Sequence, residues 1–496
     1  MNRDAEYITY EQFGAVGNGV ADDLPAICDA HAYANTHGLP VRTKPDAAYH
    51  LGRHALTVTI ETDTDWNTSR FTIDDTQVED YKKSLFYVPP PLQETLKIAQ
   101  LKRDQKQLDL QPEQDVYVYV ENEKKKRYIR RGLNQSSGTN QRDCFILRRD
   151  GSIQGDIDWN YDEITRMQCH PISLEPLSIK GGVFTTIANR MKNDVGYNYW
   201  SRNIAVNRSH VVIDGLTHYV VGETAVGCPY SGFLRIGQCG AVLLSNCFFT
   251  GHKIYTTIGS AGKPVRMGSY DVSAHSVAGF TMKQCRMNHI NDSTRWGVIN
   301  TNFCKDILLE DCRLSRMDTH MGVAGTYTIR RCCLGHMGLN AVGRGLLSIE
   351  ESTLYGRSLI NFRDDYGSTW DGDVEIRNCR WVPACGEASL PTMINANNDG
   401  MHDFGYPCSM PATITVDGLD VDDRNHPEDY QGFFLFSNYD AFGGKPSDLP
   451  LDERLTPYTL CKRVKLNNLR TASGIKPQVS SNKELCRQVK ILAKDI

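Results

Sequence analysis

Acid–base chemistry in this chain is concentrated in residues 361–373, where four carboxylates, an arginine and several aromatic side chains fall within 13 positions. We predict a groove wall in which Arg363 clamps one carboxylate and Trp370 offers a flat aromatic face. Asp364 and Asp365 are adjacent, so only one of them enters the groove. An alternative is a solvated Asp/Gly-rich turn or a calcium loop, which would be irregular because the D-x-[DN]-x-[DN]-G pattern of an EF-hand is absent.

A second stretch pairs a carboxylate with an imidazole. Asp318 and His320 lie two residues apart, with Arg316 just before them. Side chains two residues apart share one face of a β-strand, where a carboxylate can orient a nearby imidazole. These residue types suit proton transfer if the fold brings them to the groove wall formed by residues 361–373.

A recurring six-residue unit identifies the elements that position these residues. The unit is apolar at alternate positions and ends in a polar residue followed by a thiol, hydroxyl or leucine side chain. The units cover residues 211–216, 242–247, 280–285, 307–312, 327–332, 347–352, 374–379, 414–419 and 464–469. Their last positions are separated by 31, 38, 27, 20, 20, 27, 40 and 50 residues, so 20 residues make one bare coil.

Short strands at this period, with no helix between them, predict a parallel β-helix in which strands stack from coil to coil. The last positions of the units then form one column, in which we expect Cys247, Cys285, Cys312, Cys332 and Cys379 to be buried and reduced. Five consecutive coils carry His, Lys, Arg or Asp just after this column. That density favours a functional groove over a row of structural turns.

The elements outside the repeat divide the chain. A helix is predicted to begin at Asp22 or Asp23 and to end at Gly38, and a second helix to run from the capping box at residues 481–484 to the C-terminus. The predicted domains are an N-terminal cap with the first coils (1–80), an inserted α+β subdomain (81–176), the β-helix (177–475) and a C-terminal capping helix (476–496).

The insertion differs from the repeat in charge and pattern. Residues 81–140 contain 12 basic and 7 acidic residues, a net charge of +5. A polar helix is predicted over 94–108 and a strand over 116–120. Residues 121–124 are interpreted as a solvated hairpin tip rather than a nucleic-acid patch. We expect this segment to form a separate flap beside the groove.

Composition excludes several classes of protein. The 496 residues carry a net charge of −4, so the chain has no overall positive charge that would attract nucleic acid or an anionic membrane. No stretch reaches the roughly 18 apolar residues of a membrane span. The N-terminus has no apolar segment typical of a secretory signal, so we expect a cytoplasmic protein. The 16 cysteines are scattered and lack paired CxxC spacing, so neither a metal site nor a cofactor is expected.

The opening Phe13–Asp23, with the sequence FGAVGNGVADD, resembles the FGAxGDGxxDD opening of the pectate-lyase superfamily. Asn18 replaces the usual Asp. The resemblance implies an all-β, right-handed parallel β-helix, in agreement with the repeat. It also implies carbohydrate-active chemistry, since the superfamily includes glycoside hydrolases, polysaccharide lyases, uronate epimerases and phage tailspikes.

With this resemblance, a glycoside hydrolase is the favoured function and a carbohydrate the expected partner; a homo-oligomer is left open. Glycosidic cleavage needs one carboxyl group as acid and one as nucleophile or base. We assign these roles to Asp318 and Asp365, with His320 and Asp364 as further catalytic candidates. The candidates for substrate binding are Arg316, Arg363, His252, Lys253, Tyr255, Asp271, His289, Asp292, Arg295, Trp296, His336, Arg344 and Trp370, the last as a sugar-stacking face.

Two alternatives are kept. The first is a polysaccharide lyase or uronate C5-epimerase, because residues 318–320 are similar to the Asp-Pro-His motif of alginate epimerases but lack the proline. In that case His252, Lys253 and Tyr255 would complete the proton-abstracting set. The second is a non-catalytic, tailspike-like glycan-binding protein, against which the crowding of acidic, histidine and arginine side chains argues.

Overall fold

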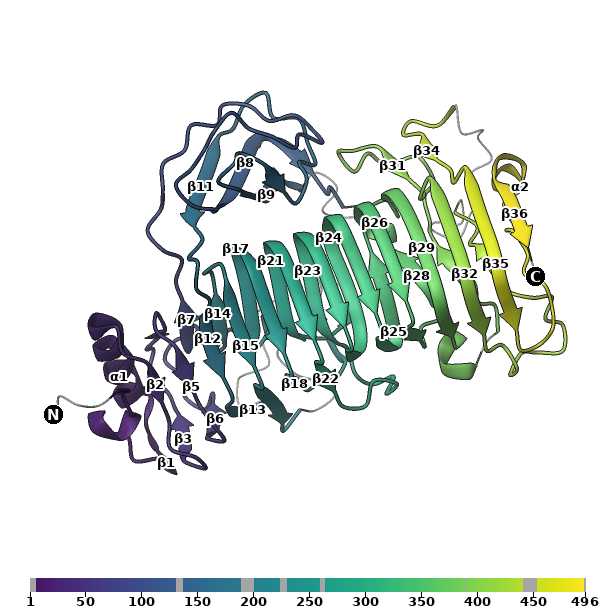
Figure 1. Ribbon diagram of the computed structural model, residues 1–496. Coiled ribbons are helices and arrows are strands. Elements are labelled where there is room, and N and C mark those ends of the chain that lie inside the picture. Colours follow the sequence, from purple (N-terminus) through teal and green to yellow (C-terminus); the bar gives the residue numbers. More distant parts are fainter. Residues whose placement is uncertain are drawn as a thin grey trace.

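The computed structural model describes residues 6–130, 137–188, 200–223, 230–258, 264–387, 389–439 and 453–494. Its main body is a parallel β-helix whose coils follow one another from the N-terminal to the C-terminal end of the molecule (Figure 1). In the described residues, 28 strands belong to one hydrogen-bonded network. No helix in this described part is long and apolar enough to cross a membrane.

The first coils are held together by the acidic pair of the Phe13–Asp23 opening. The Asp23 carboxylate accepts hydrogen bonds from the backbone N–H groups of Val16 (2.7 Å) and Gly17 (3.3 Å), and Asp22 accepts one from Gly52 (3.1 Å). The elements here are η1 (Tyr10–Phe13), β1 (Asn18–Asp22), α1 (Leu24–His37), β2 (Val41–Arg42), β3 (Ala48–Leu51), β4 (Val58–Thr59), β5 (Thr64–Asp65), β6 (Arg70–Asp74) and β7 (Phe86–Val88).

The main stack continues after the insertion. Its strands are β12 (Leu177–Lys180), β13 (Val183–Ile187), β14 (Ile204–Val206), β15 (Val211–Asp214), β16 (Thr217–Val221), β17 (Leu234–Ser245), β18 (Phe248–Phe249), β21 (Tyr270–Lys283), β22 (Arg286–Met287), β23 (Gly297–Glu310), β24 (Arg313–Arg330), β25 (Cys333–Ala341), β26 (Gly343–Glu350), β27 (Thr353–Leu354), β28 (Ser358–Phe362), β29 (Trp370–Trp381), β30 (Thr392–Asn395), β32 (Thr413–Val421), β33 (Phe434–Phe436), β35 (Arg463–Thr471) and β36 (Lys490–Lys494). Shorter elements beside the stack are β19 (Tyr255–Ile258), β20 (Pro264–Met267), η2 (Asp364–Tyr366), η3 (Pro383–Gly386), β31 (Cys408–Ser409), β34 (Tyr458–Thr459) and α2 (Lys483–Gln488).

The predicted six-residue units pair in parallel and in the predicted register. Val211 pairs with Val242, Val242 with Phe280 and Phe280 with Ile307, and the same position continues through the later units to Val464. These side chains are buried in the core of the β-helix. Alternation fixes this register, because a slip of one residue would turn every apolar side chain to the surface.

The residue at the fifth position of each unit, polar or glycine, turns a corner of the coil. All nine fifth positions have left-handed backbone angles, with φ between 48° and 82°. Gly, Asn and Asp adopt this conformation at the lowest cost, which accounts for Gly215, Asn246 and Asn378 at this position. The chain then enters the cysteine column at the sixth position.

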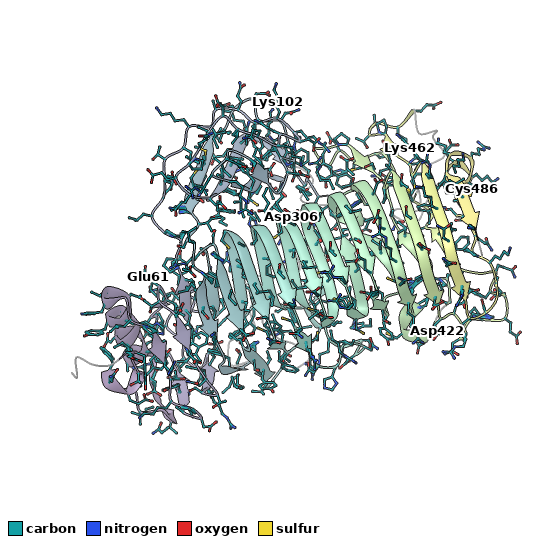
Figure 2. All side chains as sticks on the ribbon, in the orientation of Figure 1. Glu61, Lys102, Asp306, Asp422, Lys462 and Cys486 are labelled. Atoms are coloured by element: carbon teal, nitrogen blue, oxygen red, sulfur yellow. The ribbon has the colours of Figure 1, made fainter. Side chains whose placement is uncertain are left out.

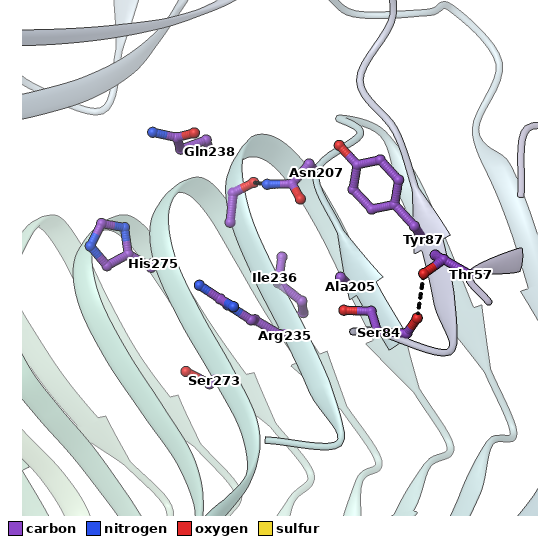
Figure 3. A pocket seen from close by; sticks show the side chains of 11 residues that line it. Thr57, Ser84, Tyr87, Ala205, Asn207, Arg235, Ile236, Gln238, Ser273 and His275 are labelled. Atoms are coloured by element: carbon purple, nitrogen blue, oxygen red, sulfur yellow. Dashed lines mark hydrogen bonds between the residues drawn. The ribbon is translucent and has the colours of Figure 1, made fainter. Parts of the chain in front are cut away.

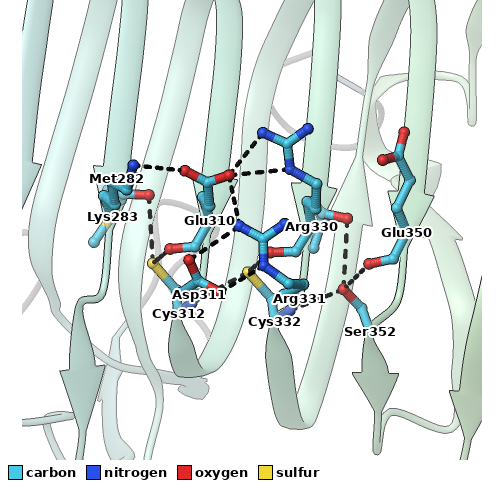
Figure 4. Close-up of polar contacts among 11 residues, drawn as sticks. Met282, Lys283, Glu310, Asp311, Cys312, Arg330, Arg331, Cys332, Glu350 and Ser352 are labelled. Atoms are coloured by element: carbon cyan, nitrogen blue, oxygen red, sulfur yellow. Dashed lines mark hydrogen bonds and ion pairs between the residues drawn. The ribbon is translucent and has the colours of Figure 1, made fainter.

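The cysteine column is buried and all five thiols are free. Within it, the backbone N–H of Cys312 donates to the Cys332 Sγ atom (3.4 Å), and the N–H of Cys332 donates to the Ser352 hydroxyl (2.9 Å) (Figure 4). Outside the column, the Glu310 carboxylate pairs with Arg330 at 2.7 Å. The small side chains thus satisfy polar groups at the corner while filling the core.

This burial predicts how the thiols react. In a Cys228→Ser background, which removes the one cysteine outside the described residues, a thiol reagent should label the exposed Cys385 and Cys486 within the native protein. The column should react only after unfolding, because burial excludes the reagent from these thiols. Counting labelled thiols before and after denaturant checks this. Rapid labelling of Cys285 or Cys332 in the native state would contradict the buried column.

The insertion contributes a sheet of its own. Strands β8 (Val116–Arg127), β9 (Thr139–Leu147), β10 (Ile153–Gln154) and β11 (Arg166–Pro171) are antiparallel in the order β10-β9-β8-β11. Their side chains alternate: Val118 and Phe145 face a separate core, while Tyr117 and Ile146 pack with Ala278 of the β-helix. The sheet lies over the middle coils in Figure 1, and Figure 2 places Lys102 on its outer side and Asp306 on the β-helix below.

Four expectations about the segments outside the repeat are wrong. Residues 94–108 form no helix, because Leu101 is buried and pairs as a bridge with Tyr161, so this part of the insertion is extended rather than α+β. β7 pairs with β4 and β14, so residues 86–88 belong to the β-helix. β8 continues through residues 121–124, which are no hairpin tip. The chain ends in β36, which pairs with β35, and α2 is only six residues long.

Candidate functional site

One outward-facing column of the β-helix carries polar residues through consecutive coils. Parallel pairing places Arg235 beside Ser273, Ser273 beside Asn300, and Asn300 beside Asp318. The column continues through Asn340, Asn361 and Asn395, whose amides donate from Asn395 to Asn361 (2.6 Å) and from Asn361 to Asn340 (2.5 Å). Core-facing neighbours such as Ile299 and Met317 are buried, so strand alternation directs this polar column outward.

Asp318 is the carboxylate of this column, and it is enclosed. Its side chain is 0% exposed and accepts hydrogen bonds from Tyr270 Oη (2.5 Å) and from Arg363 Nη1 (3.1 Å to each oxygen). Arg316 Nη2 lies 3.1 Å from the same carboxylate. Burial alone would raise the pKa of Asp318, but Arg316, Arg363 and the tyrosine hydroxyl outweigh it and lower the pKa to about 2. Asp318 is therefore an ionised group that substrate does not reach in this conformation.

Arg363 joins Asp318 to Asp365. Its Nε and Nη2 atoms donate to the two Asp365 oxygens at 3.0 and 3.1 Å, which is the bidentate geometry favoured by guanidinium groups. The Asp365 side chain is 21% exposed, and Arg130 from the insertion lies 3.3 Å from its Oδ2 atom. The predicted clamp thus exists, and Arg363 also holds a second carboxylate, that of Asp318, which lies 45 residues before it in the sequence.

Asp364 and His320 lie beside this clamp. Asp364 is exposed at the start of η2, where partial loss of hydration and the Asp365 charge raise its pKa. His320 is skipped by the register between β23 and β24, so it sits at a bulge. Burial, together with Arg363, lowers the pKa of His320 to about 4, and its ring packs edge-on against Tyr366 with centroids 5.4 Å apart. His320 is neutral at pH 7.

The aromatic residues of the site differ from the predicted set. The Arg316 guanidinium lies over the Trp296 ring (4.7 Å) and near the Tyr270 ring (5.7 Å). Trp296 is partly exposed. Trp370 offers no sugar-stacking face, because it is 0% exposed in the core and donates its indole N–H to Gly345 (3.1 Å). Trp370 is the first residue of β29, and its side chain points into the core. The Asp- and Gly-rich residues around it suggested a surface turn in the sequence instead.

A second buried cluster adjoins the first. His252 lies between Glu223 (2.8 Å) and Asp271 (3.0 Å), and Asp271 also contacts His218 (3.1 Å). Burial lowers the pKa of His252, but the Glu223 and Asp271 carboxylates outweigh it and raise the pKa to about 10. His252 and Asp271 are thus committed to each other, as positioning groups rather than substrate ligands in this conformation.

The remaining binding candidates divide by position. Lys253 and Arg295 border the second cluster, where the Lys253 backbone N–H donates to Glu223 (3.1 Å) and Arg295 Nη1 lies 3.9 Å from Glu223. Arg344 contacts the insertion through an ion pair with Asp158 (3.2 Å).

The other candidates lie away from the clamp. Asp292 and the exposed His289 share one turn, and His336 contacts the Ile290 carbonyl. Tyr255 is buried in the β19–β20 hairpin.

Three members of these clusters had no local signal in the sequence. Arg130 belongs to the basic run of the insertion, and no periodicity connects it with Asp365. Glu223 and His218 lie one coil before His252, and nothing in the sequence around them distinguishes them from polar surface residues. Within the described residues, no group of three or more His, Cys, Asp or Glu side chains is arranged to hold a metal ion.

The depressed pKa of Asp318 predicts a pH-dependent stability. A carboxyl group with a lower pKa in the folded state stabilises the fold above its unfolded pKa, and this contribution is lost as pH falls through the folded value. The change from 3.8 to about 2 corresponds to about 2 kcal/mol. The free energy of unfolding of wild type minus that of Asp318→Asn should therefore shrink as pH falls from about 5 to about 2. A difference that stays constant over this range would contradict the assignment.

Comparisons with known proteins agree with the fold. No family model matches the chain. The Pseudomonas phage phi297 tailspike gp61 superimposes with a TM-score of 0.53 at 10% identity, covering 94% of this chain and 81% of the tailspike. The AP22 bacteriophage tailspike Gp54, solved with an Acinetobacter baumannii capsular saccharide, gives a TM-score of 0.46 at 10% identity, covering 98% of this chain and 79% of that one.

One curated sequence is similar over a short stretch. The KL64-specific capsule depolymerase of Klebsiella phage P510 is 32% identical over 105 residues, which is 19% of this chain and 10% of the depolymerase. The match is therefore too short to transfer the activity of the whole depolymerase. The stacked parallel coils and the tailspike superposition show that this chain has a parallel β-helix fold, as the repeat and the Phe13–Asp23 opening predicted.

Proposed function

We propose that this chain is a glycoside hydrolase that cleaves a polysaccharide at the Arg363 clamp. The observation that carries the proposal is the pairing of one guanidinium with two carboxylates of unequal burial, on the outward polar column of a β-helix. Next to the clamp are an exposed carboxyl group with a raised pKa, Asp364, and a partly exposed aromatic ring, Trp296. Carboxyl groups in different environments are what acid–base cleavage of a glycosidic bond requires.

The roles follow from exposure and charge. Asp364 is assigned as the acid that protonates the leaving glycosidic oxygen, because its raised pKa favours the protonated form. Asp365 supplies the carboxylate that takes a proton from the attacking water or bonds to the sugar carbon. Asp318 is a positioning residue, because it is enclosed and keeps Arg363 and Tyr270 in place. This arrangement revises the predicted Asp318/Asp365 pair. It also revises the expectation that only one of Asp364 and Asp365 enters the groove, because both lie in the short helix η2 and not in a strand with alternating side chains.

The comparisons support the substrate class of the proposal. The short sequence match is to a protein named as a capsule depolymerase, and the superimposed tailspike has the same fold. A long β-helix also suits a polymer better than a small molecule, since its polar column extends over many coils.

His320 favours a second candidate function. Its neutral imidazole lies beside Arg363, and a base next to a cation is the arrangement needed to abstract a proton beside a uronate carboxylate. Lys253 and Tyr255 do not join it, because Lys253 borders the Glu223 cluster and Tyr255 lies in the β19–β20 hairpin. A lyase or epimerase would therefore depend on His320 alone as the base.

Product analysis separates these functions. The purified protein is incubated with a panel of bacterial capsular polysaccharides, and new reducing ends and ultraviolet absorbance are followed together. We expect reducing ends without an unsaturated product. Unsaturated uronates would establish the lyase, altered uronate stereochemistry without cleavage would establish the epimerase, and glycan binding with neither change would establish a non-catalytic protein.

A further inference from the structure

A second concave region lies on the same outer face, towards the N-terminal coils. It is a cavity of about 560 Å³, within the roughly 300–1,000 Å³ typical of ligand sites. Its walls come from β7, β14, β17 and β21, and Figure 3 shows Tyr87, Arg235, Gln238 and His275 around it. Neither Asp318 nor Asp365 lines this cavity, so it is distinct from the clamp.

Arg235 is the charged group that lines this cavity, and its guanidinium is unpaired within the described residues. Its side chain is exposed, and no ion pair or hydrogen bond to its guanidinium is found within the described residues. No carboxylate is among the described residues that line the cavity. By contrast, the clamp arginines Arg316 and Arg363 are both paired with Asp318. An unpaired guanidinium in a concave site that no carboxylate lines attracts an anion.

The neighbouring groups leave this positive charge uncompensated. Burial, followed by the charges of Arg142 and Arg235, lowers the pKa of His275 to about 4, so its imidazole is neutral. Glu121 of the insertion is the nearby acid, and Arg142 already pairs with it at 3.3 Å. The Asn207 amide donates to the Gly237 carbonyl (2.5 Å) and shapes the wall without adding charge.

The cavity and the clamp lie along one line of the β-helix. Arg235 and Asp318 occupy the same outward column, three strand pairings apart through Ser273 and Asn300. Adjacent strands are about 4.8 Å apart, so the two positions are separated by about 14 Å along the stack. A polymer that follows the column reaches both sites, whereas a single sugar does not.

We propose that the Arg235 cavity is a remote subsite that binds a carboxylate-bearing sugar of the polysaccharide cleaved at the clamp. The inference rests on the proposed function and adds its substrate class, an acidic polysaccharide. A guanidinium matches a sugar carboxylate through two parallel hydrogen bonds, and Tyr87 and Gln238 offer further polar contacts to ring hydroxyls. Recognition of the charge then occurs at a distance from the bond that is broken.

Binding measurements test the subsite independently of cleavage. The probes are a glucuronate-containing octasaccharide and the same octasaccharide with its carboxyl groups reduced to alcohols, each titrated by calorimetry. For wild type we expect tighter binding of the acidic form. Arg235→Gln should weaken it about 10- to 100-fold, the loss of a charge-assisted bidentate contact, and leave the reduced form unchanged. Arg286→Gln, an exposed arginine on β22, is the control and should change neither.

The outcomes separate the two proposals. Equal binding of both octasaccharides by wild type, or equal loss in Arg235→Gln and Arg286→Gln, would overturn the subsite even if the protein cleaves polysaccharides. Preferential, Arg235-dependent binding without any cleavage would support the subsite while refuting the hydrolase. An acidic disaccharide should show no Arg235 dependence of its cleavage rate, because it is too short to span the two sites.

Discussion

Replacing Asp365 with asparagine should lower the rate of glycosidic cleavage by at least about 100-fold, because the amide preserves the shape of the carboxylate but neither takes up a proton nor attacks carbon. The β-helix should stay folded, since Asp365 lies at its surface in η2 and its inner neighbour Phe362 is unchanged. The measurement is the initial rate of new reducing ends on a polysaccharide that wild type cleaves, with thermal unfolding recorded for each variant.

Two further variants make this result specific. Asp373→Asn alters an exposed carboxylate of the same segment, which accepts a hydrogen bond from the Thr413 backbone, and should leave the rate unchanged. Asp364→Asn should also be slow. We expect wild-type activity to fall as pH rises through the raised Asp364 pKa, and this fall should be absent in Asp364→Asn. Near-normal rates in both Asp364→Asn and Asp365→Asn would contradict the hydrolase proposal and favour His320 as the catalytic base of a lyase or epimerase.

The β-helix could be predicted from sequence because each coil repeats one physical requirement. Alternate apolar side chains fill the core, a left-handed corner favours residues such as Asn246 or Gly215, and the next position turns a side chain such as Cys312 or Leu216 into the core. These requirements act within six neighbouring residues. The pattern therefore survives the long loops that separate one coil from the next.

The rest of the site depends on contacts between distant segments. Asp318 and Arg363 could be selected because they lie on nearby coils of the repeat, but Arg130 reaches Asp365 from the insertion, 235 positions away in the sequence. The predicted helix over 94–108 failed for a similar reason. Its polar pattern suits a helix, but burial of Ile98 and Leu101 against the insertion core holds the chain extended. Tertiary packing overrides such local preferences.

The largest effect on stability is expected at Lys305, where the β-helix holds the insertion. Its ammonium group is 1% exposed and lies 2.6 Å from Asp143 and 2.7 Å from Asp158, both on the insertion. Burial lowers the pKa of Lys305, but these two carboxylates outweigh it and raise the pKa above its usual value, so the group is charged. Lys305→Met would leave Asp143 buried without its partner, which costs about 3–5 kcal/mol.

The loss of stability in Lys305→Met should be largest in the insertion, and it should also lower the activity. Hydrogen exchange should become faster in β8 and β9 of Lys305→Met, while Val242–Ser245 in the main stack keeps its protection, because the two sheets have separate cores. Cleavage should slow as well, since a loosened insertion no longer holds Arg130 against Asp365. The matched control is Lys124→Met, whose partner Glu163 and own side chain are exposed (51% and 69%), so it should cost no more than about 1 kcal/mol. If the two variants behave alike, the insertion is not fixed to the β-helix by Lys305, and Arg130 must reach the clamp through the packing of Tyr117 and Ile146 on Ala278 instead.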